Sequence, residues 1–268
     1  MRLLLCASVP LYSEDKHLCS AVMEEAYRIG MDGVEFKLGE SKLVSRDMTR
    51  WADRMARDLG LKPHAHLPYL HGEANIASPD PARRQSARLV MADSLSAASS
   101  LGCEIVNTHL GTRRGGGRLE TAAEELGNLM DAASDLRIRL AVENQESGCK
   151  GILNTPRDLL MLADMIPDVL LTYDAGHGNT HGFGVAEFLP SVLGHLAYLH
   201  VHDNDGSCDQ HLPLGLGNVD FRLLVSSIRQ NGSKLPQSLP VVFEVGREAV
   251  APSVKYFSEI WEESDPRG

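Results

Sequence analysis

Short runs of apolar and β-branched residues return at regular intervals along the chain, and segments with helical spacing separate them. Eight runs have the length and composition of buried strands, at 2–9, 33–37, 62–66, 104–109, 138–143, 169–174, 197–202 and 240–244. Between them, apolar residues recur on one helical face, as at Ala21, Val22, Ala26 and Ile29, and a glycine such as Gly30 often ends the segment. This alternation predicts an α/β fold, a (β/α)8 TIM barrel of eight parallel strands with its active site at their C-terminal ends.

The composition is that of a globular protein with an ordinary core. Of 268 residues, 43% are hydrophobic and 23% charged, and no linker or shift in composition divides the chain, so we predict one barrel domain over residues 1–268. The first ten residues turn polar too soon for a signal peptide, and no apolar run approaches the roughly 18 residues of a membrane span. We therefore predict a cytoplasmic protein with no membrane partner. The five cysteines include no Cys-x-x-Cys pair, which predicts free thiols.

The chain is acidic, with 36 Asp and Glu against 26 Lys and Arg and a formal net charge of −10. A surplus of this sign argues against a polyanionic partner, because phosphates are bound by excess Lys and Arg. Three bound divalent ions would add six positive charges and leave about −4. The charge therefore weakens a nucleic-acid interpretation without excluding it.

Histidine and carboxylate side chains cluster at the C-terminal ends of the predicted strands and in the loops just beyond. The nine candidates are His66, His109, Glu143, Asp174, His177, His200, Asp209, His211 and Glu244. Imidazoles and carboxylates are the ligands that zinc and similar divalent ions take in proteins. One such residue at a strand end is usually a hydrogen-bonded polar group, but nine converging on one rim of a barrel predict a metal site, because buried unpaired groups of this kind are costly.

Several motifs around these residues match a known group of TIM barrels. They are His66-Leu67-Pro68-Tyr69, Asn107-Thr108-His109-Leu110-Gly111, Glu143-Asn144, Asp174-Ala175-Gly176-His177, His200-Val201-His202-Asp203, Asp209-Gln210-His211 followed by Leu214-Gly215-Leu216-Gly217-Asn218, and Phe243-Glu244. The chain resembles the xylose isomerase-like TIM-barrel superfamily and, within it, most closely the endonuclease IV branch, apurinic/apyrimidinic endonuclease family 2. The likeness covers about residues 62 to 244, and the Asp-x-His motif with its glycine-rich continuation is the most specific element.

The resemblance implies a trinuclear zinc site built from five histidines and four carboxylates, each with a counterpart among the nine candidates. Glu143 would bridge two of the ions. It also implies a phosphoester hydrolase of endonuclease IV type, in which a metal-bound hydroxide attacks the phosphate and no protein nucleophile is needed. The cofactors would be two or three divalent ions, Zn²⁺ first and Mn²⁺ second, with no organic cofactor.

Sugar and sugar-phosphate isomerases and epimerases of the same superfamily offer an alternative, which the loop after His200 also resembles. That branch holds one ion with two Glu, one Asp and one His, a set that Glu143, Asp174, His200 and Glu244 would supply. Glu143 and Glu244 would then form the acid/base pair beside a carbonyl, and His177 would contact a substrate hydroxyl. A third interpretation is a metal-binding module without catalysis, although nine ligands exceed what a structural site needs.

The segments that would handle DNA depart from the endonuclease IV pattern. The turn after the first predicted strand, Cys6 to Pro10, lacks a histidine, and Leu216 replaces the glutamate usual between the two glycines. The loop from Phe36 to Ser41 carries one lysine and no further large aromatic residue. Inserting side chains into duplex DNA needs apolar wedges and a basic rim, so we favour a small phosphorylated or sugar substrate over nucleic acid.

Six further residues are candidates for substrate contact. They are Arg113, Arg114, Arg118, His202, Tyr69 and Asn144. The three arginines share a loop with three glycines, which is typical either of a segment that closes over a phosphate or of a plain solvated loop. His202, like His64, lies two residues from a presumed ligand and therefore on the same strand face, where it would orient a ligand, bind substrate or be a core histidine.

Overall fold

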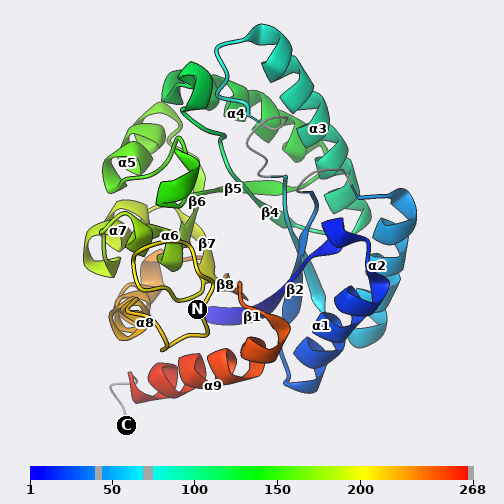
Figure 1. Cartoon of the computed structure of the whole chain (residues 1–268), viewed down its shortest axis with the longest axis vertical. Helices are drawn as coiled ribbons and strands as arrows, with labels where there is room; N and C mark the ends of the chain where they lie inside the picture. The colour runs from blue at the N-terminus through cyan, green and yellow to red at the C-terminus, as the bar shows by residue number, and fades with distance from the viewer. Residues whose placement is uncertain (40–43, 69–74, 265–268) are drawn as a thin grey trace.

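The computed structural model describes residues 1–39, 44–68 and 75–264 and confirms the predicted closed barrel (Figure 1). Its strands are β1 (Arg2–Val9), β2 (Gly33–Lys37), β3 (Lys62–His66), β4 (Ile105–Thr108), β5 (Arg139–Glu143), β6 (Leu170–Asp174), β7 (Leu196–Val201) and β8 (Ser238–Phe243). Each strand runs parallel to the next, and β8 pairs with β1 to close the sheet. The sequence analysis placed all eight strands, with errors of at most two residues at their ends.

Helices of the described chain form a ring outside the strands, except for the short helix 175–180, which follows its strand directly at the mouth of the barrel (Figure 1). They are α1 (Lys16–Arg28), α2 (Arg46–Leu59), α3 (Pro81–Ser100), α4 (Leu119–Asp135), α5 (Pro156–Met165), α6 (Ala175–Thr180), α7 (Val185–Val192), α8 (Phe221–Gln230) and α9 (Arg247–Glu263), with 3₁₀ turns η1 (Leu11–Ser13), η2 (Arg114–Gly116), η3 (Ser147–Cys149) and η4 (Gly232–Lys234). Local sequence sets their ends. Asp15 accepts hydrogen bonds at the start of α1, Thr155 and Asp158 form a capping box on α5, and Gly60 ends α2 with a φ of 67°.

Two apolar layers hold the barrel together. The larger layer lies between the outer faces of the strands and the helices, and includes Phe36, Tyr173, Phe188 and Phe257. The smaller is made only of strand residues and so fills the barrel interior; its buried members are Leu4, Cys6, Ile105, Ala141, Ala197, Tyr198 and Val242. All five cysteines are free, as predicted. No helix within the described residues combines the length and the apolar composition that crossing a bilayer requires.

Candidate metal centre

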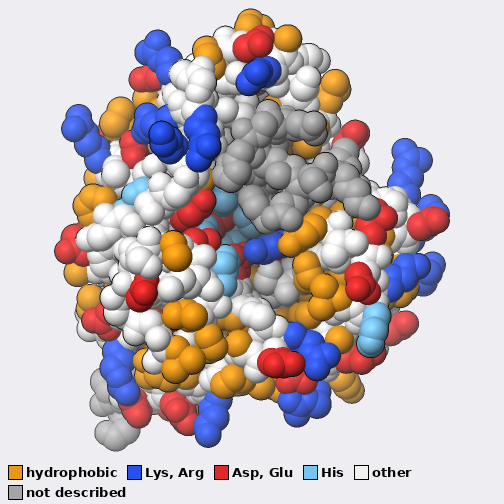
Figure 2. All heavy atoms as spheres, viewed as in Figure 1, with side chains coloured by type: hydrophobic (Ala, Val, Ile, Leu, Met, Phe, Trp, Pro, Cys, Tyr) orange, Lys and Arg blue, Asp and Glu red, His pale blue; other side chains and the backbone are white. Residues whose placement is uncertain are grey.

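The predicted ligands meet at the mouth of the barrel, where the strands end. Figure 2 shows histidine and acidic side chains gathered in a hollow at the centre of this face. The hollow is a pocket of about 140 Å³ lined by Lys37, His66, His109, Glu143, Glu146, His177, Asp209, His211 and Glu244. Seven of the nine candidates therefore line one pocket. Asp174 and His200 are fully buried beneath it and contact its lining residues.

Glu143 is the last residue of β5, and two histidines contact the same oxygen of its carboxylate. Nε2 of His66 lies 3.1 Å from Glu143 Oε2, and Nε2 of His109 lies 3.0 Å from the same atom. The amide of Asn107 also donates to this oxygen. These contacts place the two imidazoles and the carboxylate close enough to share one ion, with all three ligand atoms within 4.8 Å of one another.

Asp209 is the centre of a second group, on the loop between β7 and α8. Nε2 of His211 lies 3.1 Å from Asp209 Oδ2, and Nε2 of His177 lies 3.5 Å from the same oxygen. His202 approaches the other oxygen of Asp209 at 3.4 Å and lies 3.1 Å from Oδ1 of Asp174. The second group thus joins residues from α6, the end of β7 and the loop that follows it.

Three of these histidines are oriented by the backbone. Nδ1 of His66 donates to the carbonyl oxygen of Leu67 at 2.6 Å, Nδ1 of His177 to that of Asn144 at 2.8 Å, and Nδ1 of His211 to that of Glu244 at 2.6 Å. A carbonyl only accepts, so the proton is on Nδ1 and, in the neutral ring, the Nε2 lone pair faces the neighbouring carboxylate. Metal-binding histidines show this arrangement, in which the second nitrogen donates to a fixed acceptor.

Buried polar atoms without hydrogen-bond partners provide the test of fit. Among the described residues these include Asp174 Oδ2, Asp209 Oδ1 and both ring nitrogens of His202. Buried polar atoms in folded proteins are nearly always paired, and divalent cations placed between the carboxylates and imidazoles would pair these. The residues present therefore fit a divalent metal centre, with oxygen and imidazole donors that suit Zn²⁺ or Mn²⁺.

His200 and His202 differ in what their nitrogens contact. Nδ1 of His200 lies 2.9 Å from Glu143 Oε1 and Nε2 lies 3.0 Å from Glu35 Oε2, so each nitrogen already faces a carboxylate oxygen. The nitrogens of His202 make no hydrogen bond and point toward Asp174 and Asp209. The sequence analysis gave the ligand role to His200 and a substrate role to His202. In the structure both histidines belong to groups whose ligand atoms lie within 4.8 Å of one another, His200 with Glu143 and Asp174, and His202 with Asp174 and His177.

The charges of the centre shift the proton affinities of its members. Burial raises the pKa of Glu143, but the imidazoles of His200 and His109 lower it by more, and the pKa lies well below its ordinary value. At Glu244, burial also raises the pKa, but the positive charges of Lys37 and His200 lower it by more, so that the pKa lies below its ordinary value. The carboxylates are therefore ionised and ready to bind a cation.

Comparison with known proteins agrees with these motifs. The sequence pattern of the xylose isomerase-like TIM barrel family matches residues 23–257. The chain belongs to this family. An uncharacterized protein of Methanocaldococcus jannaschii is 28% identical over 180 residues, which is 62% of this chain and 60% of that relative, so the chain spans less than two thirds of its length. A probable endonuclease 4 of Mycobacterium leprae is 24% identical over 243 residues, 86% of this chain and 91% of the relative.

A solved structure extends the comparison to a second kind of enzyme. The crystal structure of a D-tagatose 3-epimerase-like protein superposes with a TM-score of 0.80 at 22% identity and covers 98% of this chain and 99% of its own. The xylose isomerase-like barrel is therefore found in proteins named for an endonuclease and for an epimerase.

Several residues of the centre were missed by the sequence analysis. Lys37 lines the pocket, with Nζ 3.1 Å from Glu244 Oε1, and Glu146 lines it from the loop between β5 and η3. Glu35 and Asn107 are fully buried and contact His200 and Glu143. The signal in the sequence was faint: Glu35 is a lone acid within the apolar strand 33–37, and Asn107 is a polar residue just before a predicted ligand.

The arginine loop does not reach the pocket. Arg113 donates to Asp158 at 2.8 Å and Arg114 to the carbonyl oxygen of Gly148 at 3.2 Å, while Arg118 lies 3.4 Å from Glu120. Arg113 and Arg118 line a separate groove of about 400 Å³ with Arg157 on α5. The structure thus places these three candidates outside the hollow that the predicted ligands line.

The remaining substrate candidates have different surroundings. Asn144 is buried, and its side chain accepts from the backbone N–H of Asp174 at 2.8 Å and donates to the carbonyl of Asp174 at 2.9 Å. It therefore joins the ends of β5 and β6. Tyr69 lies outside the described residues. His64 is buried inside the barrel, edge-on to Tyr198 with ring centroids 5.6 Å apart, and burial lowers its pKa to about 4.

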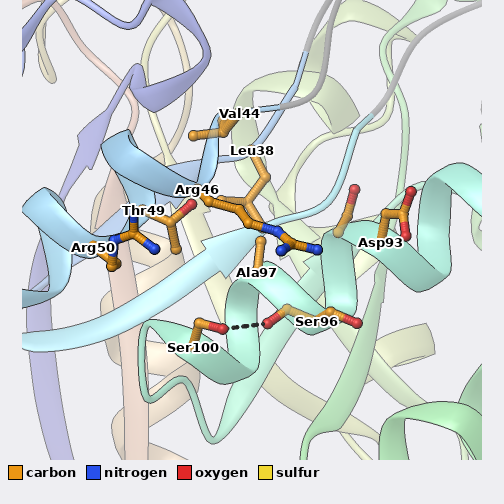
Figure 3. Close-up of a pocket in the computed structure, with 10 residues that line it drawn as sticks. Leu38, Val44, Arg46, Thr49, Arg50, Asp93, Ser96, Ala97 and Ser100 are labelled. Atoms are coloured by element: carbon orange, nitrogen blue, oxygen red, sulfur yellow. Dashed lines mark hydrogen bonds between the residues drawn. The ribbon is translucent and has the colours of Figure 1, made fainter.

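A larger pocket, of about 620 Å³, lies outside the barrel between α2 and α3 (Figure 3). Its hydroxyl groups are turned back onto their own helices. Ser94 donates to the carbonyl of Val90 at 2.8 Å, Thr49 to that of Ser45 at 3.0 Å, and Ser100 to that of Ser96 at 2.9 Å. Arg46, Arg50 and Asp93 also line this pocket, but none of the predicted ligands does, and we place the functional site at the barrel mouth.

Proposed function

We propose that this protein is a metal-dependent phosphoester hydrolase acting on a small phosphorylated substrate, with two or three divalent ions, Zn²⁺ or Mn²⁺. The proposed ligands are His66, His109, Glu143, Asp174, His177, His202, Asp209, His211 and Glu244. One observation carries the proposal: two histidines beside Glu143 and a separate group around Asp209 line the same pocket. One ion needs far fewer donors, so this set favours several ions side by side.

Divalent ions bound side by side lower the pKa of a coordinated water and neutralise the oxygens of a phosphate, so that no side chain has to act as nucleophile. The chain's own contribution is positioning. Carbonyl groups orient His66, His177 and His211, and the Asn107 amide holds one oxygen of Glu143. Lys37, at the edge of the same pocket, adds a positive charge suited to a phosphate oxygen.

The size of the pocket supports a small substrate. Its 140 Å³ is well below the several hundred Å³ of most drug-sized ligand sites. A phosphate with part of a sugar suits such a space. The arginines that would have favoured a longer polyanion pair with Asp158 and Glu120 in another groove.

A second candidate is a sugar or sugar-phosphate isomerase or epimerase with one ion and Glu143 and Glu244 as the acid/base pair. It is favoured by the common approach of the two glutamates to His200, whose Nδ1 lies 2.9 Å from Glu143 Oε1 and 3.4 Å from Glu244 Oε1. Two carboxylates around one point suit proton transfer on either side of a carbonyl. This function leaves His66, His109, Asp209 and His211 without a task.

Metal counting and two alanine variants separate the candidates. We expect two or three equivalents of Zn²⁺ per chain, and hydrolysis of p-nitrophenyl phosphate or its diester that His109→Ala and His211→Ala each lower at least about 100-fold. His17→Ala, on the exposed face of α1, is the matched control. The isomerase would instead be established by three results together. The protein would bind a single equivalent of metal, it would incorporate deuterium from solvent into a ketose, and the two alanine variants would keep full activity in that reaction.

A further inference from the structure

Three buried side chains in contact with one another form a row from the barrel interior to the metal centre. Glu35 on β2, His200 on β7 and Glu143 on β5 are all fully buried. Oε2 of Glu35 lies 3.0 Å from Nε2 of His200, and Nδ1 of His200 lies 2.9 Å from Oε1 of Glu143. The strands β2 and β7 are not neighbours in the sheet, so the contact between Glu35 and His200 crosses the interior of the barrel.

The two carboxylate oxygens of Glu143 contact different partners. Oε1 faces His200, whereas Oε2 faces His66, His109 and the Asn107 amide. A carboxylate shared between ions has to present both oxygens in fixed directions, and side chains behind the ligands usually provide this. The ring of His200 is itself packed, edge-on to Tyr198 at 5.5 Å between centroids. Its orientation, and so that of Glu143, is fixed from below.

The position of Glu35 in the barrel interior needs an explanation. A carboxylate in the interior of a barrel is costly unless it is paired, and Glu35 does not line the metal pocket. His200 belongs to two groups that could surround a cation, one with Glu35 and Glu244 and one with Glu143 and Asp174, because the ligand atoms of each group lie within 4.8 Å of one another. Both nitrogens of His200 already lie within 3.0 Å of a carboxylate oxygen, one of Glu35 and one of Glu143. The histidines whose Nδ1 donates to a backbone carbonyl keep Nε2 for an ion, so orientation is the better explanation of His200.

We infer that Glu35 and His200 are positioning residues that hold Glu143 for metal binding, and that His200 is not a ligand. This inference rests on the proposed function, since it takes Glu143 as a ligand. Glu35→Gln keeps the shape of the side chain and removes its charge. We expect it to weaken Zn²⁺ binding about 10- to 100-fold, the range found when a partner behind a ligand is lost. The measurement is a titration of metal-free protein against a competing chelator.

The chain offers a matched control for the loss of a buried glutamate. Glu125 on α4 is buried, is paired with Arg84 and Arg88 of α3, and does not line the metal pocket. Glu125→Gln should lower the unfolding temperature of the metal-free protein and leave its Zn²⁺ affinity within about twofold of wild type. A purely structural Glu35 would behave in the same way. Unchanged affinity in Glu35→Gln with a lowered unfolding temperature would therefore overturn the inference.

A double variant tests whether Glu35 acts through His200. If it does, Glu35→Gln should have little further effect on Zn²⁺ affinity in a His200→Asn background, because the link is already broken. Additive losses would contradict the inference. Should Glu35→Gln fail to fold, Glu35→Asp, which keeps the charge and withdraws it from His200, gives the same comparison with a smaller expected loss. A wild type that binds no Zn²⁺ would overturn the proposed function as well, which distinguishes the two failures.

Discussion

The imidazole ring of His202 lies against Gly176 so closely that no side chain fits between them. A Cβ atom on Gly176 would fall 2.1 Å from Cε1 of His202 and 2.5 Å from each ring nitrogen. Gly176 belongs to α6 and precedes His177, so this short helix supports two histidines of the centre, one by carrying it and one by leaving it room.

Gly176→Ala should displace His202 and weaken Zn²⁺ binding at least about 10-fold. Alanine is the better helix former by about 1 kcal/mol, so a weaker α6 would not be the cause. Gly127→Ala, in α4 where an added Cβ meets nothing within 4 Å, is the control and should keep wild-type affinity. Competition with a chelator measures both. Wild-type affinity in Gly176→Ala would remove His202 from the proposed ligands.

The side chain of Asp203 fixes, through hydrogen bonds to the backbone, the loop that carries Asp209 and His211. Its fully buried carboxylate accepts backbone N–H groups of Gly215 and Gly217 at 2.9 Å on one oxygen, and of Asn204 at 2.9 Å and Val219 at 3.1 Å on the other. Asp203→Asn would turn an amide N–H toward two of these donors. We expect it to cost about 1 to 3 kcal/mol of unfolding free energy and to lower metal stoichiometry.

Asp205→Asn is the control for this loop, because Asp205 is exposed and its carboxylate accepts hydrogen bonds from Ser207, only two residues along the chain. Urea unfolding of metal-free protein and metal analysis of loaded protein check the pair. Equal stability of the two variants would show that the Asp203 bonds do not hold the loop.

His64 should make the metal-free protein sensitive to acid. Burial lowers its pKa to about 4, against about 6.5 in an unfolded chain. Between these values the unfolded chain binds a proton that the native protein does not, so the free energy of unfolding falls as the pH falls. From pH 7.5 to pH 5 the loss is about 2 kcal/mol. His64→Leu should lack this part of the pH dependence, and an identical pH profile in urea unfolding would refute the assignment.

Metal binding should release protons at neutral pH. Burial lowers the pKa of His177, but the carboxylates of Asp174 and Asp209 raise it by more, so the pKa lies well above its ordinary value. A cation must displace that proton, and Zn²⁺ affinity should therefore rise with pH until the raised pKa is passed. Calorimetric titration at one pH in two buffers of different ionisation enthalpy measures the release. A heat that does not depend on the buffer would contradict it.

Lys37 and Arg118 should differ in their importance for a small phosphoester. Lys37 lines the metal pocket, whereas Arg118 lines the separate groove and lies 3.4 Å from Glu120. Lys37→Gln should lower kcat/KM about 10-fold or more by removing a charge near the phosphate, and Arg118→Gln should stay within about twofold. Steady-state kinetics on p-nitrophenyl phosphate decide it, and the reverse order would mean that the substrate extends to the arginine loop.

The fold could be read from the sequence because strand and helix periods alternate without interruption, and most of the candidate ligands could be read because they follow strand ends. Depth could not. His200 and His202 share one face of β7, and only the end of that strand at Val201 decides which lies inside the barrel and which at its mouth. Glu35 escaped notice because its partner His200 is 165 residues away and becomes adjacent only when the barrel closes.

The bonds from His66, His177 and His211 to main-chain carbonyls have an evolutionary consequence. Each imidazole is oriented by a backbone carbonyl just beyond a strand, that of Leu67, Asn144 or Glu244. The outer segments that would recognise a particular molecule do not provide these carbonyls. Segments that carry none of the proposed ligands could be exchanged without changing the orientation of these three rings. A barrel of this design can thus acquire new specificities by loop grafting and retain its reactive core.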